Sequence, residues 1–157
     1  MPSFSTRHRM SWTAKQMFDL VADVETYPQF VPLCENLTIT RRDEHPDHTM
    51  LVARMDVGYK AIRENMTTQV LLEPNENRIL VKYLHGPFKH LENRWSFHDA
   101  PDGCDVDFYI TYEFKSMMLQ MLMGALFDQA FRKFTKAFEE RARKVYGPYG
   151  LAASASG

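Results

Sequence analysis

Cysteine, net charge and long apolar runs are all scarce in this sequence. Cys34 and Cys104 are its two cysteines, too few for a disulfide framework and without metal-ligand spacing, so we expect two free thiols in a reducing compartment. A formal net charge of −1 provides no field that attracts polyanions, which argues against DNA as a partner. Because no stretch reaches the roughly 18 uninterrupted apolar residues that span a bilayer, any membrane contact is expected to be peripheral.

Targeting signals and common catalytic motifs are also absent. Residues 1–12 lack the charged and apolar regions of a signal peptide and the lead of a transit peptide, so we expect a cytoplasmic protein. There is no Gly-rich phosphate loop, no HisGluXaaXaaHis pattern and no GlyXaaSerXaaGly nucleophile turn. His45 and His48 flank Asp47, but no further ligands follow, and a solvated loop is expected there rather than a metal site. We therefore expect a protein that is not an enzyme and needs no cofactor.

What the sequence contains is the composition of one folded domain. It has 157 residues, of which 45% are hydrophobic and 13% aromatic, enough to bury a core without disulfides. Residues 1–147 are predicted to form this domain, and residues 148–157 a disordered tail.

The first third of the chain reads as a strand followed by two short helices. Residues 4–10 alternate with a period of two, which predicts a strand. Thr13 and Gln16 form a capping box that begins a short helix. Pro28 can take the first position of a second short helix, which Pro32 ends.

The rest of the chain reads as a meander of strands and one long helix. Strands are predicted at residues 37–42, 49–57, 61–72, 78–85, 90–98 and 104–114. The short polar turns between them make neighbouring strands antiparallel. From 117 to 146 the period becomes helical, which predicts a single helix of about 45 Å that Gly147 and Pro148 end. This order favours an α+β fold in which a curved sheet of six or seven strands covers the final helix.

A curved sheet cannot touch a straight helix along its whole width, so the fold predicts an apolar pocket between them. Clefts of this kind hold small molecules in volumes of roughly 300 to 1,000 Å³. Residues 117–127 are apolar nearly all round and rich in methionine, which suits a lining that adapts to its ligand, although a plain core helix end is the alternative. We hypothesise that this segment and residues 27–34 form the mouth of the pocket and contact a membrane.

The sequence allows two interpretations each for Glu64, for His8 and for a basic helix face. Glu64 shares the strand parity of Ile62 and Met66, which aims its carboxylate inward unless a bulge leaves it in solvent. His8 is either a satisfied core histidine or a catalytic group. Asp105, Asp107, Thr111 and Glu113 define a wet outer face of the last strand. Basic residues in 132–136 and 141–144 indicate a solvated helix face, with ribosomal RNA contact as the alternative.

Two motifs resemble those of a known family. Residues 27–34 read TyrProGlnPheValProLeuCys, and residues 86–97 read GlyProPheLysHisLeuGluAsnArgTrpSerPhe. In this order, with the long helix after them, they are similar to the coenzyme Q-binding proteins of the START-like, polyketide cyclase-related superfamily, over residues 3 to 146. The matching positions are Tyr27, Phe30, Val31, Pro32 and Cys34 in the first motif and Gly86, Pro87, Phe88, Leu91 and Trp95 in the second.

The resemblance implies a helix-grip fold with a hydrophobic tunnel that binds ubiquinone, an isoprenoid quinone, and supports its delivery or function in respiration. Ribosome-associated toxins of bacteria share both motifs, so a regulator that binds the large ribosomal subunit is an alternative. A polyketide cyclase-like enzyme is the third interpretation, with Glu64, His8, Tyr83 and Tyr112 as its candidate acid-base groups. Mitochondrial members carry a transit peptide that is absent here, so we expect a bacterial cytoplasmic protein, in peripheral contact with the inner face of the membrane.

The inner-face pattern and the motif positions together define the expected ligand-binding residues. They are Tyr27, Phe30, Val31, Leu33, Glu64, Met66, Tyr83, Phe88, Leu91, Trp95, Phe108, Tyr112, Leu122, Met123, Leu126, Phe127 and Phe131. No residue is assigned a catalytic or metal-binding role.

Overall fold

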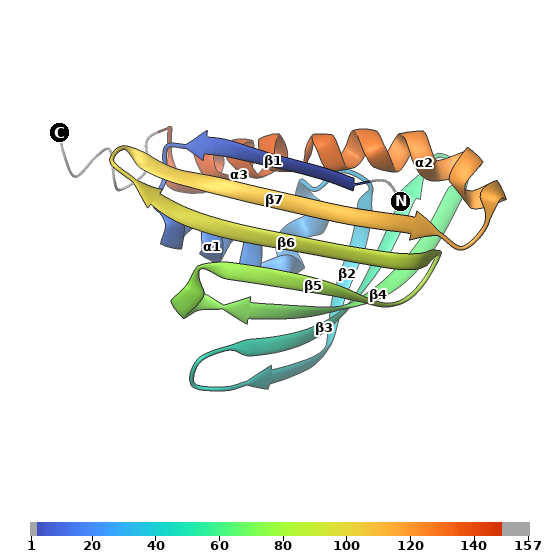
Figure 1. Cartoon of the computed structure of the whole chain (residues 1–157), viewed down its shortest axis with the longest axis horizontal. Helices are drawn as coiled ribbons and strands as arrows, with labels where there is room; N and C mark the ends of the chain where they lie inside the picture. Colours follow the sequence, from blue (N-terminus) through green and yellow to red (C-terminus); the bar gives the residue numbers. More distant parts are fainter. Residues whose placement is uncertain (1–2, 149–157) are drawn as a thin grey trace.

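Seven strands form one antiparallel sheet in the computed structural model of the protein, which describes residues 3–148 (Figure 1). The strands are β1 (Ser3–Met10), β2 (Cys34–Glu44), β3 (Thr49–Tyr59), β4 (Ile62–Glu73), β5 (Arg78–His85), β6 (Phe88–Ala100) and β7 (Gly103–Phe114). Their order in the sheet is β1-β7-β6-β5-β4-β3-β2, so the first strand pairs with the last and the others follow as a meander. The α+β class and every expected strand are confirmed. Residues 149–157, most of the expected tail, lie outside the described residues.

The first helices follow from local capping. The helix α1 (Ala14–Ala22) begins at Thr13, whose capping box with Gln16 is present as expected. It is followed by a 3₁₀ helix, η1 (Val24–Gln29), and Pro28 lies near the end of η1 rather than at its start. The prediction for Pro28 was wrong because η1 begins directly after α1 and ends where the Phe30 and Val31 amides both donate to the Tyr27 carbonyl. A short turn of 3₁₀ helix, η2 (Pro74–Glu76), joins β4 to β5.

The C-terminal helix is interrupted at Lys133, contrary to the prediction of one helix over 117–146. It forms α2 (Met117–Arg132) and α3 (Phe134–Tyr146). The Lys133 amide donates to the Ala130 carbonyl at 3.1 Å, three residues back, so the turn tightens at this point. The break brings the Phe131 and Phe134 rings into edge contact, with 5.4 Å between their centroids. The two helices thereby follow the bend of the sheet.

The sheet is strongly curved around these helices. Figure 1 shows β6, β7 and β1 running along α2 and α3, while β2, β3 and β4 cross them steeply. Register shifts between β2 and β3, β4 and β5, and β6 and β7 accompany the bend. Gly103 has a φ of +158°, and a Cβ there would lie 1.8 Å from the Met10 carbonyl oxygen. A glycine is therefore required where β7 passes the end of β1.

The inner face of the sheet forms the core, as the alternation predicted. Its buried side chains include Leu72, Ile79, Leu91, Trp95, Phe97, Val106, Phe108, Ile110, Tyr112 and Phe114. The outer face of β7 differs in one place, because Thr111, expected to be wet, is buried. Thr111 lies between Ser3 of β1 and Glu92 of β6, the two strands that flank it. Asp105 and Asp107 do face outward, where they pair with Arg9 and Arg7.

Candidate functional site

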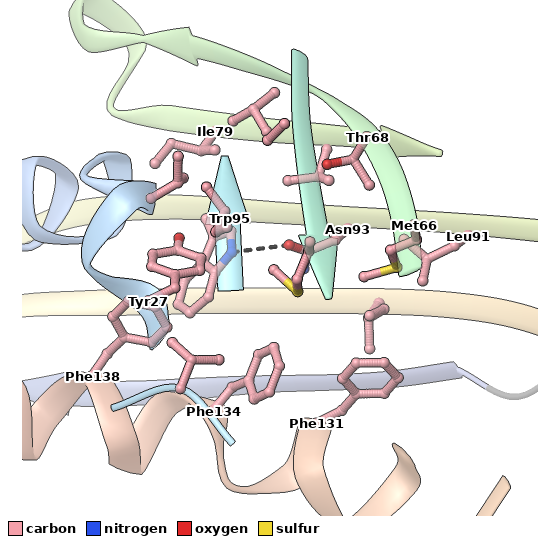
Figure 2. A pocket seen from close by; sticks show the side chains of 18 residues that line it. Tyr27, Met66, Thr68, Ile79, Leu91, Asn93, Trp95, Phe131, Phe134 and Phe138 are labelled. Atoms are coloured by element: carbon pink, nitrogen blue, oxygen red, sulfur yellow. Dashed lines mark hydrogen bonds between the residues drawn. The ribbon is translucent and has the colours of Figure 1, made fainter. Parts of the chain in front are cut away.

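An apolar cavity of about 90 Å³ lies between the inner face of the sheet and the C-terminal helices. Figure 2 shows its side chains converging from the strands on one side and from α2 and α3 on the other. The wall consists of Val24, Tyr27, Val31, Leu37, Ala53, Met55, Met66, Thr68, Val70, Ile79, Val81, Leu91, Asn93, Trp95, Ile110, Phe131, Phe134 and Phe138. The expected pocket is therefore present, in the expected place.

The cavity is smaller than expected, well below the roughly 300 to 1,000 Å³ of a pocket for a drug-sized ligand. Aromatic side chains fill much of the interior. The centroid of the Trp95 ring lies 5.1 Å from that of Phe138 and 4.8 Å from that of Phe108, and both contacts are edge-on. Since each aromatic ring occupies a large volume, the gap between sheet and helices narrows to a space with room for a few water molecules.

Three of the four polar side chains in the wall use their donors within the protein. Trp95 donates through Nε1 to Asn93 Oδ1 at 3.0 Å (Figure 2). Asn93 Nδ2 donates to the Tyr109 carbonyl at 2.9 Å. Tyr27 donates its hydroxyl to the Val21 carbonyl at 2.5 Å, and burial raises the pKa of this phenol far above its ordinary value. The fourth polar side chain is Thr68, on the inner face of β4.

Six of the residues expected to bind ligand lie in the cavity wall. They are Tyr27, Val31, Met66, Leu91, Trp95 and Phe131. Tyr27 is held there by its contact with Phe138 of α3, with 5.3 Å between ring centroids. The first motif of the sequence thus connects η1 to the C-terminal helix, and the second contributes Leu91 and Trp95 from β6.

Five expected residues instead form a packed cluster beside the cavity. Phe88 and Phe127 contact each other at 5.6 Å, and Tyr112 contacts Phe131 at 5.1 Å, so these rings fill space that the prediction left open. Met123 is buried on the same side of α2, and Phe108 lies behind Trp95. Their inward direction was predicted correctly, but their place in the wall was not, because parity gives a face and not a depth.

The other six expected residues lie nearer the surface. Phe30 packs on Phe138 from outside, and Leu33 occupies the turn before β2 with a φ of +69°. Glu64 and Tyr83 are half-buried towards the end of the sheet where β4 starts and β5 ends. Leu126 is half-buried and Leu122 is exposed on α2. None of the six is in the cavity wall. Glu64, Tyr83, Leu122 and Leu126 lie where the strands and α2 extend past the cavity, whereas Phe30 and Leu33 lie in the segment between η1 and β2.

Thr68 of β4 and Asn93 of β6 are polar residues of the wall that were not predicted to bind ligand. Both share the strand parity of apolar wall residues, Thr68 with Met66 and Asn93 with Leu91. A polar residue at an inward position was the signal that could have found them. The wall residues of β2 and β3, Leu37, Ala53 and Met55, were missed because no inner face was assigned to those strands.

The four candidate acid-base groups lie outside the cavity wall, although Glu64 is near enough to Tyr83 that burial and the Glu64 charge together raise the pKa of that phenol. His8 pairs with Glu139 of α3 at 3.0 Å on the surface, so it is neither a core histidine nor part of the cavity. Burial raises the pKa of Tyr112 and of Tyr83, which keeps both phenols neutral. Among residues 3–148 no cluster of potential metal ligands is present. Cys34 and Cys104 are free and buried, as expected.

A second hollow, of about 830 Å³, lies on the outer face of the sheet over β4, β5 and β6. It forms where the pairing of β5 with β6 stops at Lys82 and Glu92. Val81 and Leu91 line both this hollow and the inner cavity, so at this point the wall between them is a single layer of side chains. Its charged rim, which includes Arg78, distinguishes it from the apolar cavity.

The start of α2 presents apolar side chains to solvent. Met117, Met118, Met121 and Leu122 are 83%, 70%, 83% and 60% exposed, and we call this group the methionine end. The β3–β4 turn, the start of β6 and the segment before α2 lie at the same end of the molecule (Figure 1). They carry the exposed residues Lys60, Lys89 and Lys115. In residues 3–148 no helix is long and apolar enough to cross a membrane.

Comparison with known proteins identifies the family. Residues 10–139 match the model of the polyketide cyclase/dehydrase and lipid transport family. The chain belongs to this family. A ribosome association toxin, RatA of Vibrio cholerae, is 33% identical over 94% of this chain and 99% of its own length. The coenzyme Q-binding protein COQ10 homolog B of Xenopus laevis is 29% identical over 92% of this chain, which spans 59% of that relative.

A solved structure confirms the fold. A START superfamily protein from Mycobacterium smegmatis superposes with a TM-score of 0.75, at 24% identity, over 91% of this chain and 98% of its own. The helix-grip fold implied by the two motifs is therefore correct. The family contains proteins named for a toxin, for coenzyme Q binding and for polyketide cyclisation, so membership does not by itself select a function.

Proposed function

We propose that this protein binds an isoprenoid quinone such as ubiquinone in the cavity, without transforming it, and supports the delivery or function of that quinone in respiration. The observation that carries the proposal is the apolar cavity between the sheet and α2–α3, with few polar groups in its wall. Such a wall suits a ligand with a polar ring and a hydrocarbon tail. The name of the Xenopus relative supports the choice of coenzyme Q.

Binding rather than catalysis is favoured by the position of the candidate acid-base groups, which lie outside the cavity wall. A cyclase needs an acid and a base that converge on the substrate. Here His8 lies on the surface with Glu139, and Glu64 lies outside the cavity wall. The polar wall groups Asn93 and Trp95 hold each other in place.

A quinone enters only if the cavity enlarges, and α2 is the element placed to move. Its contacts with the sheet are between rings, such as Phe127 with Phe88 and with Phe114. Apolar contacts of this kind are non-directional and re-form after a shift. We propose that α2 moves outward at the methionine end to admit the quinone ring towards Trp95 and Leu91.

The first experiment is mass spectrometry of organic extracts from the purified protein. We expect a quinone to co-purify in a ratio approaching one per chain. Phe131→Asp places a charge in the cavity wall and should lose the quinone. Lys133→Asp, on the solvent side of the break, is the matched control and should retain the quinone. Extracts that contain no quinone, together with no uptake of added ubiquinone, would overturn the proposal.

A membrane is the proposed source of this ligand, and the methionine end is the proposed contact surface. Exposed methionine and leucine side chains insert into the headgroup region of a bilayer, and nearby lysines attract anionic lipids by about 1 kcal/mol each. Met117, Met118 and Met121 are the most exposed large apolar side chains within residues 3–148, and Lys115 lies two residues before Met117. The same end of α2 would then meet the bilayer and open.

Flotation with liposomes tests this contact. We expect association with vesicles containing anionic phospholipid and loss of it when Met117, Met118 and Met121 are all changed to Ser. Val145→Ser is the control, because Val145 is also exposed, at 51%, but lies near the far end of α3 (Figure 1). Equal flotation of all three proteins, or none for the wild type, would remove the membrane contact.

Ribosome association is a second candidate, favoured by a basic stripe and by the name of the Vibrio relative. Lys133, Lys136, Arg143 and Lys144 are exposed on and beside α3. If they contact ribosomal RNA, co-sedimentation with large ribosomal subunits should fall steeply with salt. It should also fall in a Lys136→Glu, Lys144→Glu variant but not in Lys15→Glu on α1. Sedimentation that is insensitive to salt and to these changes would exclude this candidate.

A further inference from the structure

Thr68 places a hydroxyl in the cavity wall that makes no hydrogen bond within residues 3–148. The residue is 8% exposed and lies between Met66 and Val70, which also line the cavity (Figure 2). Its backbone is fixed by pairing with Ala53 of β3 on one side and Tyr83 of β5 on the other. Polar groups inside folded proteins usually have a hydrogen-bond partner. The Thr68 hydroxyl is therefore available to a group that enters the cavity.

The surroundings restrict what that partner can be. Most of the other polar donors in the wall are taken, since Trp95 donates to Asn93, one N–H of the Asn93 amide donates to Tyr109 and Tyr27 donates to Val21. The remaining wall near Thr68 is apolar, with Met66, Val70 and Val81. A charged partner would be unpaired in such a wall. The fitting partner is an uncharged oxygen that accepts a hydrogen bond, carried on an apolar ring.

We infer that Thr68 is a specificity-determining residue, which donates its hydroxyl hydrogen to a carbonyl oxygen of the bound ligand. The inference rests on the proposed function and deepens it, because it distinguishes ring ketones and quinones from hydrocarbons of the same shape. A neutral hydrogen bond contributes modestly when it replaces one to water, so its loss should weaken binding by about two- to tenfold. A hydrocarbon gains nothing from this hydroxyl.

The test compares duroquinone with durene, its hydrocarbon counterpart. Quenching of tryptophan fluorescence measures duroquinone affinity, and displacement of duroquinone measures durene affinity. Thr68→Val removes the hydroxyl at nearly constant shape, and Thr68→Ser retains it. Thr67→Val is the matched control, because Thr67 is equally buried, at 8%, but does not line the cavity.

We expect Thr68→Val to weaken duroquinone binding about two- to tenfold and to leave durene binding unchanged or tighter. Thr68→Ser and Thr67→Val should bind duroquinone like the wild type. If Thr68→Val binds duroquinone with unchanged affinity, or weakens both compounds equally, the role of Thr68 is overturned while cavity binding stands. If the wild type binds neither compound, the proposed function itself fails. Circular dichroism of each variant identifies loss of folding. If Thr68→Val does not fold, Thr68→Ala, which also removes the hydroxyl, takes its place in the comparison with Thr68→Ser and Thr67→Val.

Discussion

Trp95 connects the sheet, the helices and the cavity through one side chain. It is 3% exposed, stacks on Phe97 and makes edge contacts with Phe108 of β7 and Phe138 of α3. Its indole donates to Asn93, which orients both side chains at the cavity wall. The residue therefore contributes to stability and to the shape of the site at once.

We expect Trp95→Ala to lower the free energy of unfolding by about 3 to 5 kcal/mol, because it removes a buried aromatic side chain and leaves a void. Urea denaturation followed by circular dichroism measures this change. Trp95→Phe, which keeps a ring and loses the hydrogen bond to Asn93, should be destabilised by less. A Trp95→Ala protein with the wild-type midpoint and slope would contradict the assignment of this side chain to the core.

The two cysteines are expected to be chemically silent in the folded protein. Burial raises the pKa of Cys34 to about 12 and that of Cys104 to about 12, so almost no reactive thiolate is present at pH 8. Titration with a thiol reagent should therefore detect few thiols per chain in buffer and two in denaturant. Rapid reaction of one thiol in buffer would mean that its surroundings open without global unfolding.

At the scale of single elements, the points where helices and strands begin, end or break are more informative than the helices and strands themselves. The capping box at Thr13 and the strand turns obey local rules, and the sequence predicted them. The break at Lys133 obeys no such rule, since neither proline nor glycine lies there. Its cause is tertiary, because Phe131 and Phe134 pack on Tyr112 and Phe108 of the same strand, β7.

The junction of β7 with the end of β1 gives a prediction about backbone packing. Gly103→Ala should destabilise the protein by more than about 1 kcal/mol, because the new Cβ would lie 1.8 Å from the Met10 carbonyl oxygen. Gly147→Ala is the control, since Gly147 also has a positive φ, +92°, but has open space around it. Thermal unfolding compares the two variants. Equal losses of stability in the two variants would mean that the positive φ alone, and not the close approach to Met10, causes the destabilisation.

At the scale of the whole molecule, the fold could be predicted much further than the site. Periodicity identified the inner face, and with it Leu91 and Met66 of the cavity wall, because a buried face needs apolar residues at fixed spacing. Two short motifs indicated the family. The depth of each residue could not be predicted, since Phe88 and Leu91 share one strand and one is in the wall while the other is not. Depth depends on curvature, which strand patterns do not encode.

The volume of the site was also beyond prediction, for a related reason. Whether rings such as Phe127 and Tyr112 line a space or fill it depends on how α2 packs on the sheet, where Phe127 contacts Phe114 and Tyr112 contacts Phe131. If the protein binds a quinone as proposed, a space of that size forms only after α2 shifts. The small cavity is then the closed state of a larger site.

The most direct measurement is the binding isotherm of a short-chain ubiquinone to a variant whose cavity is filled. Ala53 lies in the wall and is 3% exposed, so Ala53→Leu occupies the cavity with the protein's own atoms. We expect this variant to remain folded and to lose quinone binding at least tenfold, while Ala61→Leu, at an exposed position in the β3–β4 turn, binds like the wild type. Wild-type affinity in a folded Ala53→Leu protein would place the ligand elsewhere and contradict the account.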